Sequence, residues 1–151
     1  MEGLNSDGGE RLLHFNCTRG PYDENDRTSY YRSLDADFAL VPRGDGRWTY
    51  RFSEAVLACS IPVVIADGLT LPFEQLVSWD SVVVRVPEAA LDAMASVRDL
   101  IALLPTGEEE RARRTSEVCR IRELYFASAR RREQAAMHAA RIVVAASASR
   151  P

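Results

Sequence analysis

Hydrophobic residues along the chain gather in short runs that glycine-rich and charged segments separate. Three of these runs, at 37–41, 61–66 and 81–86, are apolar for most of their length. Strands that are buried on both faces, as in the parallel sheets of α/β proteins, have this pattern. The runs therefore predict three neighbouring parallel strands, and a shorter apolar run at 11–16 predicts a further strand.

Helical periodicity lies between and after these runs. An apolar stripe with i, i+3, i+4, i+7 spacing follows the first of the three runs and predicts a helix; its members are Phe52, Ala55, Val56 and Cys59. Helices are also predicted at 26–36, at 87–104 and from about 106 onward, where Thr106 and Glu109 have the spacing of a capping box. Alternating strands and helices indicate an α/β fold, a Rossmann-like parallel sheet with flanking helices.

The length of 151 residues fits one domain with a single core. Residues 1–10 are polar and glycine-rich, which predicts disorder. We expect the folded domain to occupy 11–145, with the long helix at its end, and to be followed by a frayed tail at 146–151.

Composition excludes several classes of protein. A net charge of −3 and a pI near 5.5 argue against a general nucleic-acid binder. All 19 basic residues are arginine, so a Walker A phosphate loop and a Schiff-base lysine are both excluded. The 3 cysteines and 2 histidines match no zinc-ligand spacing and no disulfide framework, and no metal site is expected. No apolar run is long enough to span a membrane, and no secretion signal precedes the first run.

A glycine loop with basic residues separates the first of the three strands from the helix that follows. Gly44 and Gly46 occupy the first two positions of a G-x-G-x-x-G pattern, and Thr49 stands where the third glycine would be. The N–H groups of a helix N-terminus bind phosphate, and glycine lets the backbone approach the anion. Arginines bracket this helix start, and their planar guanidinium groups pair well with phosphate oxygens; they are Arg43, Arg47 and Arg51.

Glu54 follows Arg51 by three residues, so the two side chains share one helix face. A carboxylate at this place suits the hydroxyl groups of a ribose, and the arginines suit a diphosphate. The pattern thus indicates a nucleotide-diphosphate site. It is equally compatible with a surface ion pair worth less than about 1 kcal/mol, beside glycines that only make a turn.

The stretch 37–80 contains, in this order, "LVPRG", "RFSEAV", "IPVVIADG" and "LPF" followed by "W". These motifs resemble the signature region of the exostosin-type glycosyltransferases, family GT47. The resemblance implies a GT-B fold, in which two Rossmann-like halves face each other across a cleft, and this chain resembles the C-terminal, donor-binding half. It also implies a nucleotide-sugar donor such as a UDP-sugar, a glycan or polysaccharide acceptor bound through an N-terminal half, and the Golgi lumen as the location.

By the resemblance, Arg51 would contact the diphosphate and Glu54 the ribose, while Arg43 and Gly44 would shape the loop. Asp67 matches an acidic residue of the family's "SDG" motif, although an aspartate before a glycine is also a common turn former. We expect the side chains of Arg43, Arg51, Glu54 and Asp67 to converge on one cleft at the carboxyl ends of the strands. No catalytic base is assigned, because GT-B enzymes often place it in the other half.

The sequence departs from the family at two places near this helix. Thr49 stands where the family usually has serine, which keeps a hydroxyl group. Cys59-Ser60 replaces the family's Gly-Cys, and the loss of that glycine is expected to crowd the end of the helix.

Three functions fit these patterns. The first is the donor half of a glycosyltransferase. The second is a non-catalytic fragment or degenerate module that binds a nucleotide sugar or a partner. The third is an unrelated dehydrogenase, in which Asp67 would bind the cofactor ribose about 20 residues after the glycine motif.

Overall fold

A computed structural model describes residues 36–44 and 49–148. The predicted strand at 11–16, all but the last residue of the predicted helix at 26–36 and the expected disordered segment 1–10 lie outside the described residues.

The sheet consists of β1 (Phe38–Pro42), β2 (Ile61–Ile65) and β3 (Val84–Arg85), which are parallel and lie in the order β1-β2-β3. This arrangement confirms the prediction of three neighbouring parallel strands. Every residue of the central strand β2 is buried, which explains the uninterrupted apolar run. β3 is shorter than predicted, because the chain before it forms a 3₁₀ turn, η1 (Trp79–Ser81).

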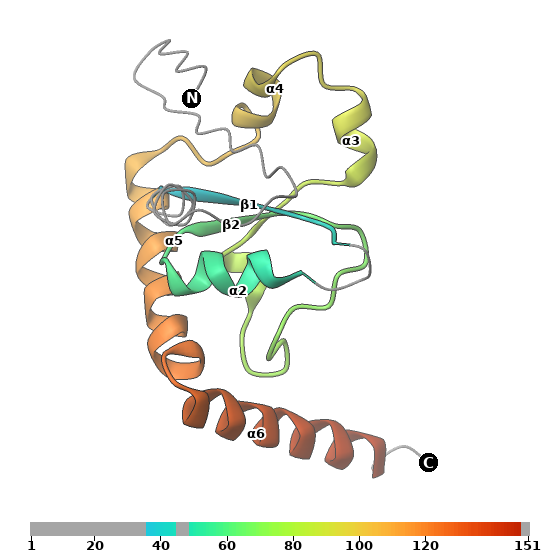
Figure 1. The fold of residues 1–151 in the computed structure, drawn as a ribbon, viewed down its shortest axis with the longest axis vertical. Coiled ribbons are helices and arrows are strands. Elements are labelled where there is room, and N and C mark those ends of the chain that lie inside the picture. The colour runs from blue at the N-terminus through green and yellow to red at the C-terminus, as the bar shows by residue number, and fades with distance from the viewer. Residues whose placement is uncertain (1–35, 45–48, 149–151) are drawn as a thin grey trace, which may run out of the picture. The chain divides into compact units, whose positions relative to one another are not determined.

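One face of the sheet is covered by α2 (Tyr50–Leu57), which contacts β1 and β2 (Figure 1). The predicted apolar stripe buries Phe52, Ala55 and Val56. The ring of Phe52 lies edge-on to the indole of Trp79 with ring centroids 4.8 Å apart. The indole Nε1 donates a hydrogen bond of 2.7 Å to the carbonyl oxygen of Pro72, so its one polar group is satisfied within the core.

The opposite face of the sheet packs on α3 (Glu88–Asp92) and α4 (Val97–Ile101), which Figure 1 shows on the other side of β1 and β2 from α2. The prediction of one helix over 87–104 is wrong, because a second helix start interrupts it. The carboxylate of Asp99 accepts hydrogen bonds from the N–H groups of Ala95 and Ser96, at 2.8 and 2.9 Å. These contacts stabilise a new helix N-terminus and separate α4 from α3.

The C-terminal region consists of α5 (Glu108–Ile121), the π-helical segment η2 (Arg122–Phe126) and α6 (Ala129–Ala148). The prediction of one long helix is therefore wrong. The wide turn of η2, closed by a hydrogen bond from the N–H of Ala127 to the carbonyl of Arg122, places Phe126 in the core. The Ser128 hydroxyl then accepts from the N–H of Arg131 and begins a new helix.

One smaller expectation for this region is also wrong. α5 begins after Gly107 with no side-chain cap, so Thr106 and Glu109 form no capping box. Helix α6 continues through Ala148, so the first residues of the expected tail are helical, and the fraying of that tail stays a prediction. The hydroxyl of Ser147 donates to the carbonyl of Val143 at 2.9 Å, and the alanines of this segment are strong helix formers.

A disulfide joins Cys59, directly after α2, to Cys119 in α5, with their Cα atoms 4.9 Å apart. The inference that the cysteines match no disulfide framework is therefore wrong. The two residues are 60 positions apart, and only the packing of α2 against α5 brings them together.

Candidate functional site

The carboxyl ends of the strands carry three charged residues, two of which contact the third, Glu88. Arg43 follows β1, Asp67 lies shortly after β2, and Glu88 begins α3 soon after β3. The Nε atom of Arg43 lies 3.3 Å from Glu88 Oε1. In parallel sheets, ligands bind at this edge, because loops from successive strands meet there.

Asp67 and Glu88 exchange two hydrogen bonds although they are 21 residues apart. The N–H of Asp67 donates to Glu88 Oε1 at 3.3 Å, and the N–H of Glu88 donates to Asp67 Oδ1 at 3.4 Å. The turn continues through Gly68, whose φ of 69° is in the left-handed region that favours glycine. The turn after β2 is thus hydrogen-bonded to the start of α3.

The N-terminus of α2 is the second part of the candidate site. Thr49 is the N-cap, and its hydroxyl accepts a hydrogen bond of 3.3 Å from the N–H of Arg51. The hydroxyl that this chain keeps in place of the family's serine therefore caps the helix. The positive end of the helix dipole lies here, and Arg51 is in the first turn of the helix.

Arg51 and Glu54 form an ion pair of 3.9 Å on one face of α2, and their side chains are 41% and 36% exposed. This finding confirms that they share a helix face. Both heads remain accessible to solvent, so the pair stays weak and a ligand would not need to displace buried charges.

The structure thus brings together some of the predicted residues. Arg43 and Asp67 meet through Glu88, Arg51 and Glu54 meet on α2, and Gly44 is exposed at the start of the loop between β1 and α2. Gly46 and Arg47 lie outside the described residues. The convergence of the two pairs on one cleft stays a prediction.

The sequence patterns did not single out Glu88, which was predicted only as part of the helix at 87–104. A usable signal was present, because Glu88 comes soon after the third predicted strand, as Asp67 comes soon after the second. Residues in such positions meet at one edge of a parallel sheet.

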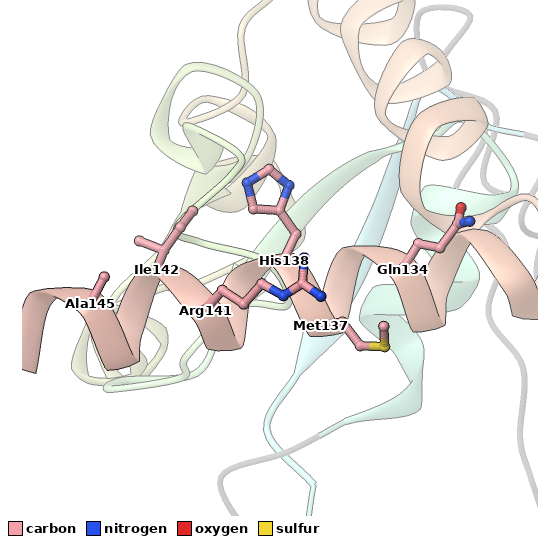
Figure 2. Close-up of a pocket in the computed structure, with 6 residues that line it drawn as sticks. All are labelled: Gln134, Met137, His138, Arg141, Ile142 and Ala145. Atoms are coloured by element: carbon pink, nitrogen blue, oxygen red, sulfur yellow. The ribbon is translucent and has the colours of Figure 1, made fainter.

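Over 36–44 and 49–148, no group of three or more histidine, cysteine, aspartate or glutamate side chains could hold a metal ion. No helix of that part is long and apolar enough to cross a membrane. A hollow does lie along one face of α6, but all six side chains that line it come from this one helix (Figure 2). It is therefore an open helix surface, and it carries no argument for a ligand site.

Electrostatic contacts fix α5 to the segment that leads into β3. Glu110 accepts hydrogen bonds from Arg113 and Arg114, which lower the pKa of its carboxyl group to about 2. Arg114 also donates to the carbonyl groups of Val82 and Val83, at 3.1 and 2.9 Å. Arg113 and Arg114 thus pair with a glutamate of the same helix, and Arg114 also binds backbone carbonyls of the neighbouring segment.

Comparison with known proteins gives an independent result. The family model for the exostosin GT47 domain matches residues 7–100, which is more than half of the chain. A protein of Caenorhabditis elegans named exostosin-1 homolog is 40% identical over 67 residues, which cover 44% of this chain and 18% of that protein.

Two plant proteins are similar as well. One from Arabidopsis thaliana, named probable beta-1,4-xylosyltransferase, is 42% identical over 62 residues, or 40% of this chain and 15% of that protein. One from Oryza sativa subsp. japonica, named probable glucuronosyltransferase, is 35% identical over 79 residues, or 52% of this chain and 18% of that protein. The chain thus spans less than a fifth of the length of these relatives.

The family match includes the glycine loop, the start of α2 and the turn at Asp67, so it argues against an unrelated dehydrogenase. By this match, which agrees with the motifs in 37–80 and with the parallel sheet that carries them, the chain belongs to the exostosin GT47 family of glycosyltransferases.

Proposed function

We propose that this chain is the donor-binding half of a GT-B glycosyltransferase and that it binds a nucleotide-diphosphate sugar, most simply a UDP-sugar, for glycan or polysaccharide synthesis. The observation that carries the proposal is the position of Arg51 and Glu54 in the first turns of α2, beyond the carboxyl end of β1. At the carboxyl end of a parallel strand, the start of the following helix is where α/β proteins bind phosphate.

The chemistry assigns each group a role. The N–H groups at the start of α2 and the guanidinium groups of Arg51 and Arg43 bind the diphosphate through charge-assisted hydrogen bonds. Glu54 accepts hydrogen bonds from the ribose hydroxyls. Arginines and helix N–H groups supply the positive charge that a divalent cation would otherwise provide, so donor binding in this proposal needs no metal.

The proposal includes an acceptor-binding half that contributes the catalytic base and closes over the donor. Closure excludes water, which strengthens the electrostatic contacts with the diphosphate. The chain alone should therefore bind UDP weakly and should not transfer sugar. A full enzyme would bring the glycan acceptor to the same edge of the sheet.

The disulfide between Cys59 and Cys119 supports a location in the secretory pathway. Disulfides form and persist in oxidising compartments and are rare in the cytosol. This agrees with the Golgi lumen, which the family resemblance implies and which we include in the proposal.

Calorimetric titration of the 151-residue chain with UDP, with and without EDTA, tests the proposal. We expect weak UDP binding that EDTA does not change, and weaker binding of UMP, because UMP lacks the second phosphate. No UDP binding would overturn the proposed function. Loss of binding with EDTA would contradict the metal-free site, and sugar transfer by the chain alone would contradict the need for a second half.

A further inference from the structure

Glu88 contacts the loops that follow both other strands of the sheet. Its Oε1 atom accepts a hydrogen bond from the N–H of Asp67, after β2, and lies 3.3 Å from Nε of Arg43, after β1. We propose that Glu88, which is anchored on the turn at Asp67, is a positioning residue that holds Arg43 in place for the donor diphosphate. The inference rests on the proposed function and adds to it a residue that the motifs do not contain.

The backbone of Glu88 is held in place as well, which limits where its carboxylate can lie. Glu88 follows Pro87, which has a φ of −59° and precedes the first turn of α3. The N–H of Glu88 donates to Asp67 Oδ1, so the residue is held by a backbone contact as well as a side-chain contact. Its side chain is 30% exposed, which leaves it less mobile than a fully solvated carboxylate.

The ion pair with Glu88 should restrict the motion of Arg43 most, because the Arg43 side chain is long and 55% exposed. A solvated arginine samples many rotamers, and ordering it on binding would weaken the affinity for a ligand. The ion pair joins Glu88 Oε1 to Nε, one of the three nitrogens that carry the five N–H groups of the guanidinium. The guanidinium is thus oriented while the donors on its Nη atoms can still reach phosphate oxygens.

Glu88 has two opposite effects on an anionic ligand. Its negative charge repels the ligand, whereas its contacts with Asp67 and Arg43 hold Arg43 in a position to bind it. Asp67 and Glu88 carry two negative charges and Arg43 one positive charge, so the three-residue cluster is net negative. The substitution Glu88→Gln separates the two effects, because the amide oxygen keeps the acceptor and the charge is lost. Glu88→Ala removes both.

The test is calorimetric titration of the full chain with UDP, comparing wild type with Glu88→Ala, Glu88→Gln, Arg43→Ala and the double variant Glu88→Ala/Arg43→Ala. Contacting residues couple in such cycles. We expect Glu88→Ala to weaken UDP binding about fivefold to tenfold. Glu88→Gln should bind at least as tightly as wild type. The double variant should bind no more weakly than Arg43→Ala, because Glu88 acts through Arg43.

Thermal unfolding of each variant shows whether a loss of UDP affinity comes from a loss of folded protein. Should Glu88→Ala fail to fold, Glu88→Gln still tests the inference. Independent effects of Glu88→Ala and Arg43→Ala, or clearly weaker binding by a stably folded Glu88→Gln, would overturn the inference. Unchanged UDP affinity of Glu88→Ala would overturn it too, and would leave the proposed function intact. Absence of UDP binding by the wild type would overturn the proposed function, and this inference with it.

Discussion

Cys59, which is disulfide-bonded to Cys119, adopts a left-handed backbone conformation with a φ of 60° at the end of α2. Its N–H donates to the carbonyl of Val56, and the N–H of Ser60 donates to the carbonyl of Ala55. These two bonds form a Schellman motif, in which the left-handed position is usually glycine. Cys59 stands where the family has this glycine, so the crowding expected there takes the form of backbone strain at Cys59. The same residue joins α2 to α5 through the disulfide.

The disulfide should contribute substantially to stability, because it closes a loop between residues 60 positions apart. We expect Cys119→Ser to lower the free energy of unfolding by about 4 kcal/mol in the chain-entropy description. Chemical denaturation measures the difference, and Cys17→Ser is the control for loss of a cysteine. Thiol titration of the denatured, unreduced wild type should give one thiol per chain, and three thiols there would refute the pairing.

The strain at Cys59 gives a second, finer prediction. Cys59→Gly breaks the same disulfide as Cys119→Ser but relieves the left-handed conformation, which costs a residue with a side chain about 1–2 kcal/mol. We therefore expect Cys59→Gly to be the more stable variant by about 1 kcal/mol or slightly more. Equal stability of the two variants would show that the conformation carries no measurable strain.

Glu110 makes stability depend on acid pH. Its pKa is lowered from 4.5 to about 2, first by the hydrogen bond from Arg113 and then by that from Arg114. A lowered pKa in the folded state stabilises the fold above pH 4.5, and this contribution is lost as the pH falls through about 2. We expect Glu110→Gln to be less stable than wild type at pH 7, and the difference to shrink steadily as the pH falls towards 2.

Denaturant unfolding at several pH values between 7 and 2 measures this difference. Glu109→Gln, an exposed neighbour, controls for the loss of one negative charge. A gap between Glu110→Gln and wild type that stays constant across the range would contradict the assignment.

The burial of Phe52 against Trp79 predicts how much stability is lost when its side chain is removed. Phe52 is 2% exposed, so Phe52→Ala should cost about 3–5 kcal/mol of unfolding free energy. Leu57 lies on the same helix and is 45% exposed, so Leu57→Ala should cost much less than Phe52→Ala. Similar losses in both variants would contradict the packing of α2 on the sheet.

Local patterns were enough to predict the sheet and α2. β1 and β2 are continuous apolar runs, and the stripe that includes Phe52 is buried as its spacing predicts. Helix limits were less predictable, because they depend on particular contacts. Asp99 starts α4 by capping it, and the wide turn of η2 places Phe126 in the core.

In the candidate site, too, contacts between near neighbours in the sequence were predictable and contacts between distant residues were not. Arg51 and Glu54 could be paired from their spacing alone, because three residues along a helix bring two side chains to one face. Glu88 is 21 residues from Asp67, and the disulfide joins residues 60 positions apart. Contacts of this range follow from the order and register of the strands and from helix packing, which a single sequence does not specify.

Titration of UDP into wild type and Arg51→Ala tests the central claim, donor binding at the start of α2, most directly. Removal of one charged phosphate contact should cost about 1.5–3 kcal/mol of binding free energy, at least a tenfold loss of affinity. Arg120→Ala, which removes an exposed arginine from α5, is the matched control and should bind as wild type does. Equal UDP affinity of wild type and a folded Arg51→Ala would contradict the account.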